Sequence, residues 1–388
     1  MAYGETLGCA STYTATVHWR GGQRVYTYID KVESVRWTRE RRKISEATVT
    51  VAASGVGPGC MARLLQTYEW VHEITLYRDG RAVWQGPVSL RDVTVSGNEP
   101  IRVDLTAKDV MGYAERRLLQ ETHKLEDVDL SEMGKAAIES AFSTRDPNIV
   151  DHVVARPSGT SGDRTIRAYS RFASDEISEI GGEGVDWTCV GRTVFFNAPA
   201  TDKTTPQGAI TGNHLMGDVH VISSGEDYAS RVFAAPQAQE GVWQHLEGVG
   251  GHSPIYGLVD YVVQTSHPYN VDEDGQWQQS GEDGLSQAET EAALRRAAQS
   301  RHGQMSRPPL VLRPADNSQL DAATPISIDR LVPGARIDLA VGTQDSLAVQ
   351  AAMRLMSVTV DWGPAGERVQ VSLAQIGGPN DQDDLEAP

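Results

Sequence analysis

The sequence predicts a mainly β protein with helices, an α+β fold in which two antiparallel sheet units flank a mixed α/β middle. Three observations lead to this prediction. Apolar and polar residues alternate with a period of two over much of residues 1–110, which is typical of half-buried strands. Most of the helical spacing falls within residues 111–208, and extended patterns return over residues 209–376. A chain of 388 residues is long enough for two to four packed units.

The first predicted unit, residues 1–110, begins with Tyr13, Ala15, Val17 and Trp19 alternating with polar residues. Its clearest feature is Asp79-Gly80, which supplies the positive φ angles of a tight type I′ turn between two strands. We expect Gly86-Pro87 to end the second of these strands. The sequence then predicts a helix from Lys108 with Val110, Ala114 and Leu118 on one side. The other predicted elements are strands at 24–29, 32–37, 47–53, 74–78, 81–85, 88–95 and 101–106, and a short helix at 61–68.

The middle, residues 111–208, carries two predicted helices and a short aromatic hairpin. The first helix, 129–143, has Met133, Ala137 and Phe142 as its buried side. The second begins at Ser174 and is ended by Gly181-Gly182. The hairpin turns at Gly191-Arg192, and we interpret Cys189 within it as a small buried thiol, since no motif for a nucleophile surrounds it.

The second predicted sheet unit, residues 209–376, carries an insertion at about 236–306 made of polar loops and one helix. Ser286 and Glu289 form a capping box that begins this helix, which we expect to end near Arg301. Residues 377–388 are too polar to pack, and the sequence predicts a disordered acidic tail there. The predicted strands lie at 218–222, 228–234, 258–264, 310–313, 335–340, 355–362 and 367–375.

Charge and cysteine content exclude several classes of protein. The formal net charge is −17, from 35 basic and 52 acidic residues, which argues against general nucleic-acid binding and against attachment to anionic membranes. No apolar run reaches about 18 residues, so the sequence predicts no membrane anchor. The 3 cysteines lie far apart, which predicts no disulfide framework and favours folding in a reducing cytoplasm.

A basic run stands out against this acidic background. It consists of Arg36, Arg39, Arg41, Arg42 and Lys43, between two predicted strands. One interpretation is a solvated hairpin tip. The other is a subunit contact with an acidic neighbouring chain, which suits a protein that is negative elsewhere.

The sequence contains no recognisable catalytic, cofactor or metal motif: it has no phosphate-binding loop, nucleophile elbow, paired Cys-x-x-Cys or His-Glu-x-x-His. In the loop at 270–282, Asn270, Asp272, Asp274 and Gly275 match the first half of a calcium loop, but position 281, where a bidentate carboxylate should stand, is glycine, and Glu282 lies one place late. A hairpin turn is the alternative interpretation. His245, His252 and Glu247 form a loose set that would allow contact with a metal, and the alternative interpretation is that these histidines are solvated loop residues. Carboxylates such as those of Asp186 and of Glu226-Asp227 could in principle serve a glycosidase, but they are expected by chance in so acidic a chain.

Two segments of the first unit resemble a known family. YRDGRAVWQGPV at 77–88 and IRVDLTAKDVMGYAERRLL at 101–119 are similar to the N-terminal part of tail hub proteins of long-tailed bacteriophages, often described as minor tail proteins and related to baseplate hubs. Three later segments follow in the same order. They are the helix, glycine break and hairpin of 177–196, the segment 218–232, and Arg-Leu-Val-Pro-Gly at 330–334 with the hairpin of 355–376.

The resemblance implies a structural virion protein without enzymatic activity or cofactor. It implies a homotrimer in which each chain contributes two tail-tube-like β-barrel or sandwich domains, so that six domains form a ring. Such a hub joins the hexameric tail tube, or a distal tail protein, to the threefold tail tip or fibres. The protein would be made in the host bacterial cytoplasm and located at the tail tip of the virion.

The resemblance also gives the charge a use. We hypothesise that acidic residues line a lumen through which DNA passes without specific binding during ejection. Two alternatives remain open, a virion-associated cell-wall hydrolase and a tail protein that binds host carbohydrate. For the latter, Trp243 and Trp277 in polar loops are the candidates for surface contact.

Overall fold

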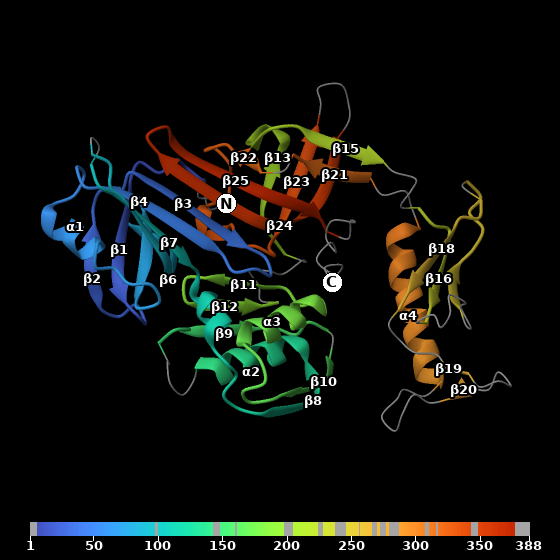
Figure 1. Ribbon diagram of the computed structural model, residues 1–388. Coiled ribbons are helices and arrows are strands. Elements are labelled where there is room, and N and C mark those ends of the chain that lie inside the picture. The colour runs from blue at the N-terminus through green and yellow to red at the C-terminus, as the bar shows by residue number, and fades with distance from the viewer. Residues whose placement is uncertain are drawn as a thin grey trace. The chain divides into compact units, whose positions relative to one another are not determined.

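The computed structural model describes residues 6–97, 100–142, 148–159, 161–197, 205–223, 228–236, 246–255, 257–265, 270–271, 277–278, 287–306, 310–315, 317–342 and 348–376. The chain divides into two compact units (Figure 1). The first comprises Met1–Val219 with Arg313–Pro388, and the second comprises His220–Leu312. The predicted β-rich α+β fold is confirmed.

The N-terminal strands of the first unit form an antiparallel sheet in the order β2-β1-β5-β6-β7-β4-β3. Asp79 and Gly80 between β5 and β6 have φ angles of 47° and 81°, which confirms the predicted turn conformation. The strands are β1 (Tyr13–Trp19), β2 (Val25–Ile29), β3 (Ser34–Glu40), β4 (Glu46–Ala52), β5 (His72–Arg78), β6 (Arg81–Thr94) and β7 (Arg102–Lys108), and α1 (Pro58–Leu64) lies between β4 and β5.

Strand β6 continues through Gly86-Pro87, where we expected a strand to end. It changes partner there, pairing with β5 up to Pro87 and with β7 from Val88 onward. A Cβ atom on Gly86 would lie 1.7 Å from the carbonyl oxygen of Lys108, so this position requires glycine. The Gly-Pro pair therefore marks a bend within one long strand.

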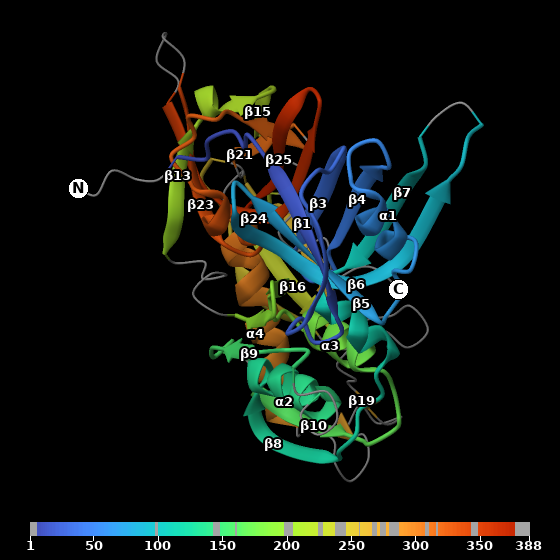
Figure 2. The same ribbon diagram turned by 90° about the vertical axis from the view of Figure 1, so that its left-hand side faces the viewer.

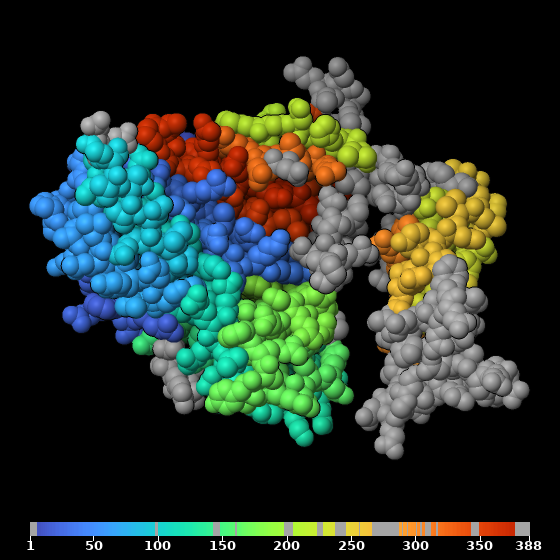
Figure 3. All heavy atoms as spheres, in the orientation of Figure 1, coloured from blue at the N-terminus to red at the C-terminus, as the bar shows by residue number. Residues whose placement is uncertain are grey.

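The C-terminal strands join the same sheet through β24. Strand β24 pairs with β23 along its first part and with β3 from Ser357 to Trp362, while β25 follows its other edge. The N-terminal and C-terminal strands thus form one 13-stranded sheet, and they lie side by side in Figures 1 and 3. The additional strands are β13 (Pro206–Thr211), β14 (Leu215–Met216), β22 (Ser318–Leu320), β23 (Arg336–Gly342), β24 (Ala348–Gly363) and β25 (Gly366–Gln375), and the short 3-10 helices are η3 (Gly212–His214) and η4 (Ile328–Arg330).

The middle of the chain packs two helices around a separate apolar core. Met133, Ala137 and Phe142 on α2 are buried in this core, as predicted. Gly134 lets α2 approach Phe196, since a Cβ there would lie 2.6 Å from the phenyl ring. Figure 2 shows α2 with β8, β9 and β10 around it. The elements are β8 (His123–Asp129), α2 (Leu130–Phe142), β9 (His152–Ala155), β10 (Ser161–Ile166), α3 (Ala173–Gly182), β11 (Trp187–Val190) and β12 (Thr193–Phe196).

The helix expected from Lys108 is a 3-10 helix, η1 (Val110–Arg116), so the predicted α-helical stripe is wrong. Asp109 caps its first turn by accepting a hydrogen bond from the Met111 amide. The backbone is extended from Arg117, and Leu118 bridges to Phe172. Leu118 therefore lies beyond the helix.

The second unit contains a three-stranded sheet in the order β17-β16-β18, covered by the long helix α4. Leu294, Ala298 and Met305 of α4 are buried against this sheet. The predicted insertion at about 236–306 lies within this unit. Its elements are β15 (Val219–Ser223), β16 (Arg231–Ala235), β17 (Glu247–Gly250), β18 (Asp260–Gln264), β19 (Asn270–Val271), β20 (Trp277–Gln278), α4 (Gln287–Met305) and β21 (Leu310–Pro314).

Some predictions are not settled by this structure. The domain boundaries near residues 110 and 208, and the barrel-like layout of two flanking domains, stay predictions. The tail at 377–388 lies outside the described residues. Among the helices that are described, none is both long and apolar enough to cross a membrane.

Candidate functional site

The basic run lies in β3 and in the β3–β4 connection, and three of its five side chains point into the protein. Arg39 is buried, and its guanidinium donates to the carbonyl oxygens of Ile328 and Leu331 at 2.9 and 3.1 Å and to that of Val83 at 2.8 Å. Burial lowers the pKa of Arg39 to about 10. Its side chain thus ties the N-terminal strands to the segment before β23.

Arg41 and Arg42 converge on one buried carboxylate, that of Asp186 immediately before β11. An Nη atom of Arg41 lies 2.6 Å from Oδ1 of Asp186, and an Nη atom of Arg42 lies 3.1 Å from the same oxygen. Arg354 of β24 forms an ion pair with the other oxygen, Oδ2. We call these four residues the Asp186 cluster.

The Asp186 cluster joins three segments that are distant in the sequence. The β3–β4 connection, the middle hairpin and strand β24 each contribute charged side chains. Such a buried set is stable only while its members are paired, because an uncompensated charge in the interior is costly. The cluster therefore fixes how the middle region sits on the large sheet.

A second buried group centres on Glu73 of β5. Its carboxylate accepts hydrogen bonds from the Tyr113 hydroxyl at 2.9 Å and the Gly21 amide at 2.8 Å, and it is ion-paired with Arg192. Burial, together with the Glu73 charge, raises the pKa of Tyr113 well above its ordinary value. Arg192 stands at the turn of the middle hairpin and also donates to the carbonyl oxygen of Ile149 at 2.9 Å.

A third group ties the N-terminal segment to the last hairpin. Glu367 of β25 accepts from the Nε and Nη2 atoms of Arg78 at 2.8 and 2.7 Å, and from the Tyr13 hydroxyl at 2.9 Å. The Ala10 amide donates to the same carboxylate at 2.8 Å. Each of the three groups thus connects parts of the chain that strand pairing alone leaves separate.

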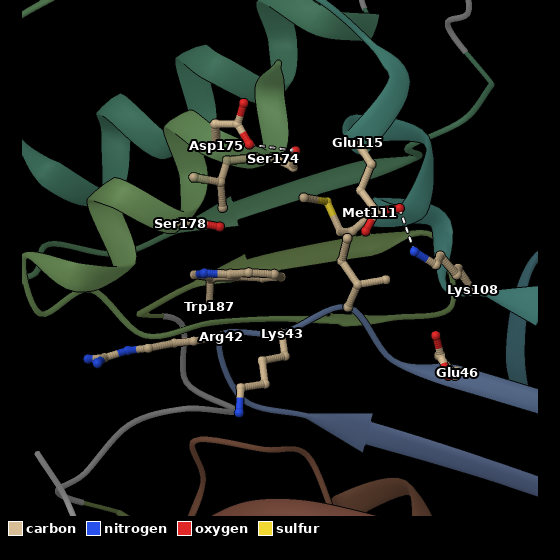
Figure 4. A pocket seen from close by; sticks show the side chains of 12 residues that line it. Arg42, Lys43, Glu46, Lys108, Met111, Glu115, Ser174, Asp175, Ser178 and Trp187 are labelled. Carbon is tan, nitrogen blue, oxygen red and sulfur yellow. Dashed lines mark hydrogen bonds and ion pairs between the residues drawn. The ribbon is translucent and has the colours of Figure 1, made fainter. Parts of the chain in front are cut away.

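A hollow of about 540 Å³ opens beside the Asp186 cluster, between the β3–β4 connection, η1 and α3 (Figure 4). Trp187 and Met111 form its apolar side, and Lys108 forms an ion pair with Glu115 at 2.6 Å on its rim. Ser174 and Ser178 face it, and the Ser174 hydroxyl lies 3.5 Å from Oδ1 of Asp175 (Figure 4). This contact is at the limit of hydrogen-bonding distance and joins neighbouring residues of α3, and the lining that is described contains no histidine.

The sequence-predicted contact residues fall into two sets. Arg39, Arg41 and Arg42 form hydrogen bonds or ion pairs with other residues of this chain, as described above. Arg36 is exposed and lies 3.7 Å from Asp361 on the neighbouring β24, and Lys43 is exposed at the rim of the hollow. A subunit contact through Arg36 or Lys43 stays a prediction.

The predicted surface tryptophans and the calcium-like loop are only partly described. Trp243 lies outside the described residues, and Trp277 stands in β20, opposite Val271 of β19. This pairing is that of a hairpin across 270–278. The residues between the two strands, which carry the carboxylates of the loop, lie outside the described part.

Within the ranges that the structure describes, no group of three or more histidine, cysteine or acidic side chains is placed to hold a metal ion. Cys189 is buried as predicted, and burial raises its pKa well above the ordinary value. Of the other sequence candidates, Glu247 forms an ion pair with Arg295 at 3.1 Å, and His252 lies in an exposed loop. His245 and Glu226-Asp227 lie outside the described residues.

Sequence analysis did not identify the roles of Glu73, Asp186 and Arg192. A weak signal was present, because Glu73 follows buried His72 in a strand and Asp186 stands between Val185 and Trp187 in an apolar segment. A charge inside an apolar strand pattern indicates an internal partner. The pattern does not reveal which residue the partner is.

Comparison with known proteins supports the fold. No protein-family model matches the sequence, and no curated protein matches it. Solved structures do match. A tail protein from Neisseria meningitidis MC58 has a TM-score of 0.55 at 11% identity, covering 94% of this chain and 97% of that one.

Two prophage proteins match over similar lengths. The 43 kDa tail protein of prophage MuSo2 from Shewanella oneidensis has a TM-score of 0.57 at 10% identity, covering 94% of this chain and 99% of that one. The prophage tail protein gp18 from Listeria monocytogenes EGD-e has a TM-score of 0.50 at 9% identity, covering 92% and 94%. The resemblance found in the sequence motifs is therefore confirmed, and this chain has the fold of phage tail proteins.

Proposed function

We propose that this chain is a structural component of a phage tail: a homotrimeric hub that joins the tail tube to the threefold tail tip. The observation that carries the proposal is the fold match, which spans nearly the whole length of both chains compared for two tail proteins. The order of the sequence motifs along the chain agrees with it. In this role the protein belongs to the virion and has no enzymatic activity.

The internal ion pairs suit such a role. A hub transmits force between tube and tip, which requires its sheet and its middle region to move as one body. The buried groups at Asp186 and Glu73 connect the sheet to the middle region, and the group at Glu367 connects the N-terminal segment to the last hairpin of the sheet. Binding partners are then a tube or distal tail protein on one side and tip or fibre proteins on the other.

The net charge of the chain is consistent with the proposal that DNA passes through the hub. With a net charge of −17, a ring of three copies repels phosphate unless basic residues are concentrated on its inner wall. The purified protein should therefore show no binding to double-stranded DNA at about physiological ionic strength. Tight, salt-sensitive DNA binding would contradict an acidic lumen.

The proposal is tested by imaging the purified chain by electron microscopy at high protein concentration. We expect threefold particles with a central opening. A uniform population of monomeric particles would contradict the hub. Parallel assays of cell-wall digestion and glycan binding test the alternatives, and activity in either would favour a hydrolase or a carbohydrate-binding tail protein instead.

A further inference from the structure

An aromatic cluster lies on the surface of the first unit where β1, β2 and α1 meet (Figure 1). The His72 ring is buried at its centre, with ring centroids 4.7 Å from Trp19, 4.4 Å from Tyr26 and 6.1 Å from Tyr68. Nδ1 of His72 accepts a hydrogen bond from the Tyr68 amide at 2.9 Å, which holds the segment after α1 against the sheet. Trp19 and Tyr68 remain 38% and 54% exposed.

Two arginines contact the residues of this cluster, and a third lies next to β2 in the chain. Arg63 donates to the carbonyl oxygen of Tyr26 at 2.8 Å, and Arg91 donates to that of Leu65 and lies over the Tyr68 ring at 5.9 Å. Arg24 is exposed at the turn between β1 and β2. Among the described residues, none of the three has a carboxylate partner.

We call Trp19, Tyr26, Tyr68, Arg24, Arg63 and Arg91 the arginine–aromatic face. Tyrosine, tryptophan and arginine are the residues that contribute most to binding at protein interfaces. The three arginines bring positive charge to this face in a chain whose net charge is −17. Its chemistry therefore fits an acidic protein surface.

The first unit has such a surface elsewhere, at the bulge in the pairing of β8 with β10. Glu126, Asp127 and Asp163 are exposed there, and no described basic side chain pairs with them. Oδ1 of Asp163 accepts from the Asp127 amide at 2.8 Å, and Oδ1 of Asp127 accepts from the Ser161 hydroxyl at 2.8 Å, so the bulge is well formed. We call these three residues the acidic tip.

The two surfaces are on different sides of the unit. In Figures 1 and 2, α1 lies beside the strands of the large sheet, whereas β8 and β10 lie at the lower end. Among the described residues of one copy, no ion pair joins the two surfaces. Their charges are compensated when two different copies meet.

We infer that the arginine–aromatic face of one copy packs against the acidic tip of the next copy. A contact between two different surfaces of identical chains forms a closed ring of three when each copy is rotated by a third of a turn, without translation, relative to the last. Such a contact thus deepens the proposed homotrimer, on which it rests, by naming its interface. Because the partner is this chain itself, the charges on both sides are known.

A charge-swap experiment tests the interface. Arg24→Glu with Arg63→Glu should dissociate the trimer, raising the apparent dissociation constant at least about tenfold, because like charges then face each other. Glu126→Arg should weaken it in the same direction. The chain that carries all three substitutions should recover trimer, since each interface regains opposite charges. Masses are measured by analytical ultracentrifugation, and unchanged circular dichroism confirms folding.

The matched control changes the same charge elsewhere. Arg156 and Arg167 are exposed on the middle region. Arg156→Glu with Arg167→Glu should leave the trimer intact. Equal dissociation by control and test variants would show a general charge effect and overturn the inference.

Cross-linking gives an independent measurement. Arg24→Lys with Arg63→Lys keeps the charges and places amines that a carbodiimide joins to nearby carboxylates. The expected product is an intermolecular peptide pair linking position 24 or 63 to Glu126, Asp127 or Asp163. Cross-links from these positions only to other carboxylates would overturn the interface.

The outcomes separate this inference from the proposed function. A wild-type trimer that is unaffected by Arg24→Glu with Arg63→Glu overturns the interface and leaves the hub standing. A wild-type chain that stays monomeric at high concentration overturns both. Loss of trimer in both sets of single-surface variants, with recovery in the combined one, supports the interface.

Discussion

Two sets of arginines in the same unit behave in opposite ways. Arg41, Arg42 and Arg354 are turned inward onto Asp186, whereas Arg24, Arg63 and Arg91 stand on the surface without a described carboxylate. Both sets are accompanied by aromatic residues, so composition alone does not distinguish them. The inward set holds the sheet and the middle region together. The outward set is the one that we propose to contact another chain.

The largest expected effect comes from removing the centre of the inward set. Asp186→Ala leaves the guanidinium groups of the cluster uncompensated, and we expect the free energy of unfolding to fall by about 3–5 kcal/mol. Chemical denaturation followed by circular dichroism measures this. The control is Asp361→Ala, which removes an exposed partner of Arg36 and should cost less than about 1 kcal/mol. Equal losses would remove the distinction between buried and exposed pairs.

Asp109 is a buried carboxyl like Asp186, but its partners are mainly backbone amides and not arginines. Burial raises its pKa to about 7, against the hydrogen bonds from the Ser45 and Met111 amides. The folded state thus binds more protons than the unfolded state between pH about 4 and 7. Over that range the contribution of Asp109 to stability should fall as the pH rises, by up to about 1.4 kcal/mol per pH unit, and stay constant above.

The measurement is the free energy of unfolding as a function of pH for the wild type and for Asp109→Asn. The difference between the two proteins should change across this range in the stated direction. A difference that is independent of pH would show that the Asp109 carboxyl has an ordinary pKa in the folded protein.

A smaller loss is expected at the contact between the N-terminal segment and the last hairpin. Glu367→Gln keeps the shape of the side chain but weakens its hydrogen bonds to Arg78 and Tyr13, at a cost of about 1–3 kcal/mol. Limited proteolysis should then cut the N-terminal segment earlier. Unchanged stability and unchanged proteolysis would mean that this segment is held by its other contacts.

The smallest effect on folding should come from the outward set. Arg24→Glu with Arg63→Glu should change the unfolding free energy of the dissociated chain by no more than about 1 kcal/mol, because both side chains are exposed. Thermal denaturation at low protein concentration checks this. A loss comparable to that of Asp186→Ala would assign these arginines a structural role.

Sequence patterns predicted the local elements well. The strand at Tyr13–Trp19, the Asp79-Gly80 turn and the buried side of α2 are visible in short-range alternation and turn residues. These features depend on neighbours within a few positions. The prediction that a strand ends at Gly86-Pro87 was wrong. Glycine is required at position 86 because the backbone of Lys108, on the next strand, lies very close to it.

The pairing of β3 with β24 and the inward course of the basic run could not be predicted. Arg41 finds its carboxylate at Asp186, 145 positions away, and Arg39 donates to a carbonyl 289 positions away. A run of basic residues next to a turn has the same composition whether it is solvated or buried. Only tertiary structure decides between the two.

The central claim, that this chain is a trimeric tail hub, is tested most directly by its mass in solution. Sedimentation equilibrium of the wild-type protein over a range of concentrations should give a species of three times the 42.1 kDa chain mass. A species that remains at the mass of one chain at the highest concentration would contradict the claim.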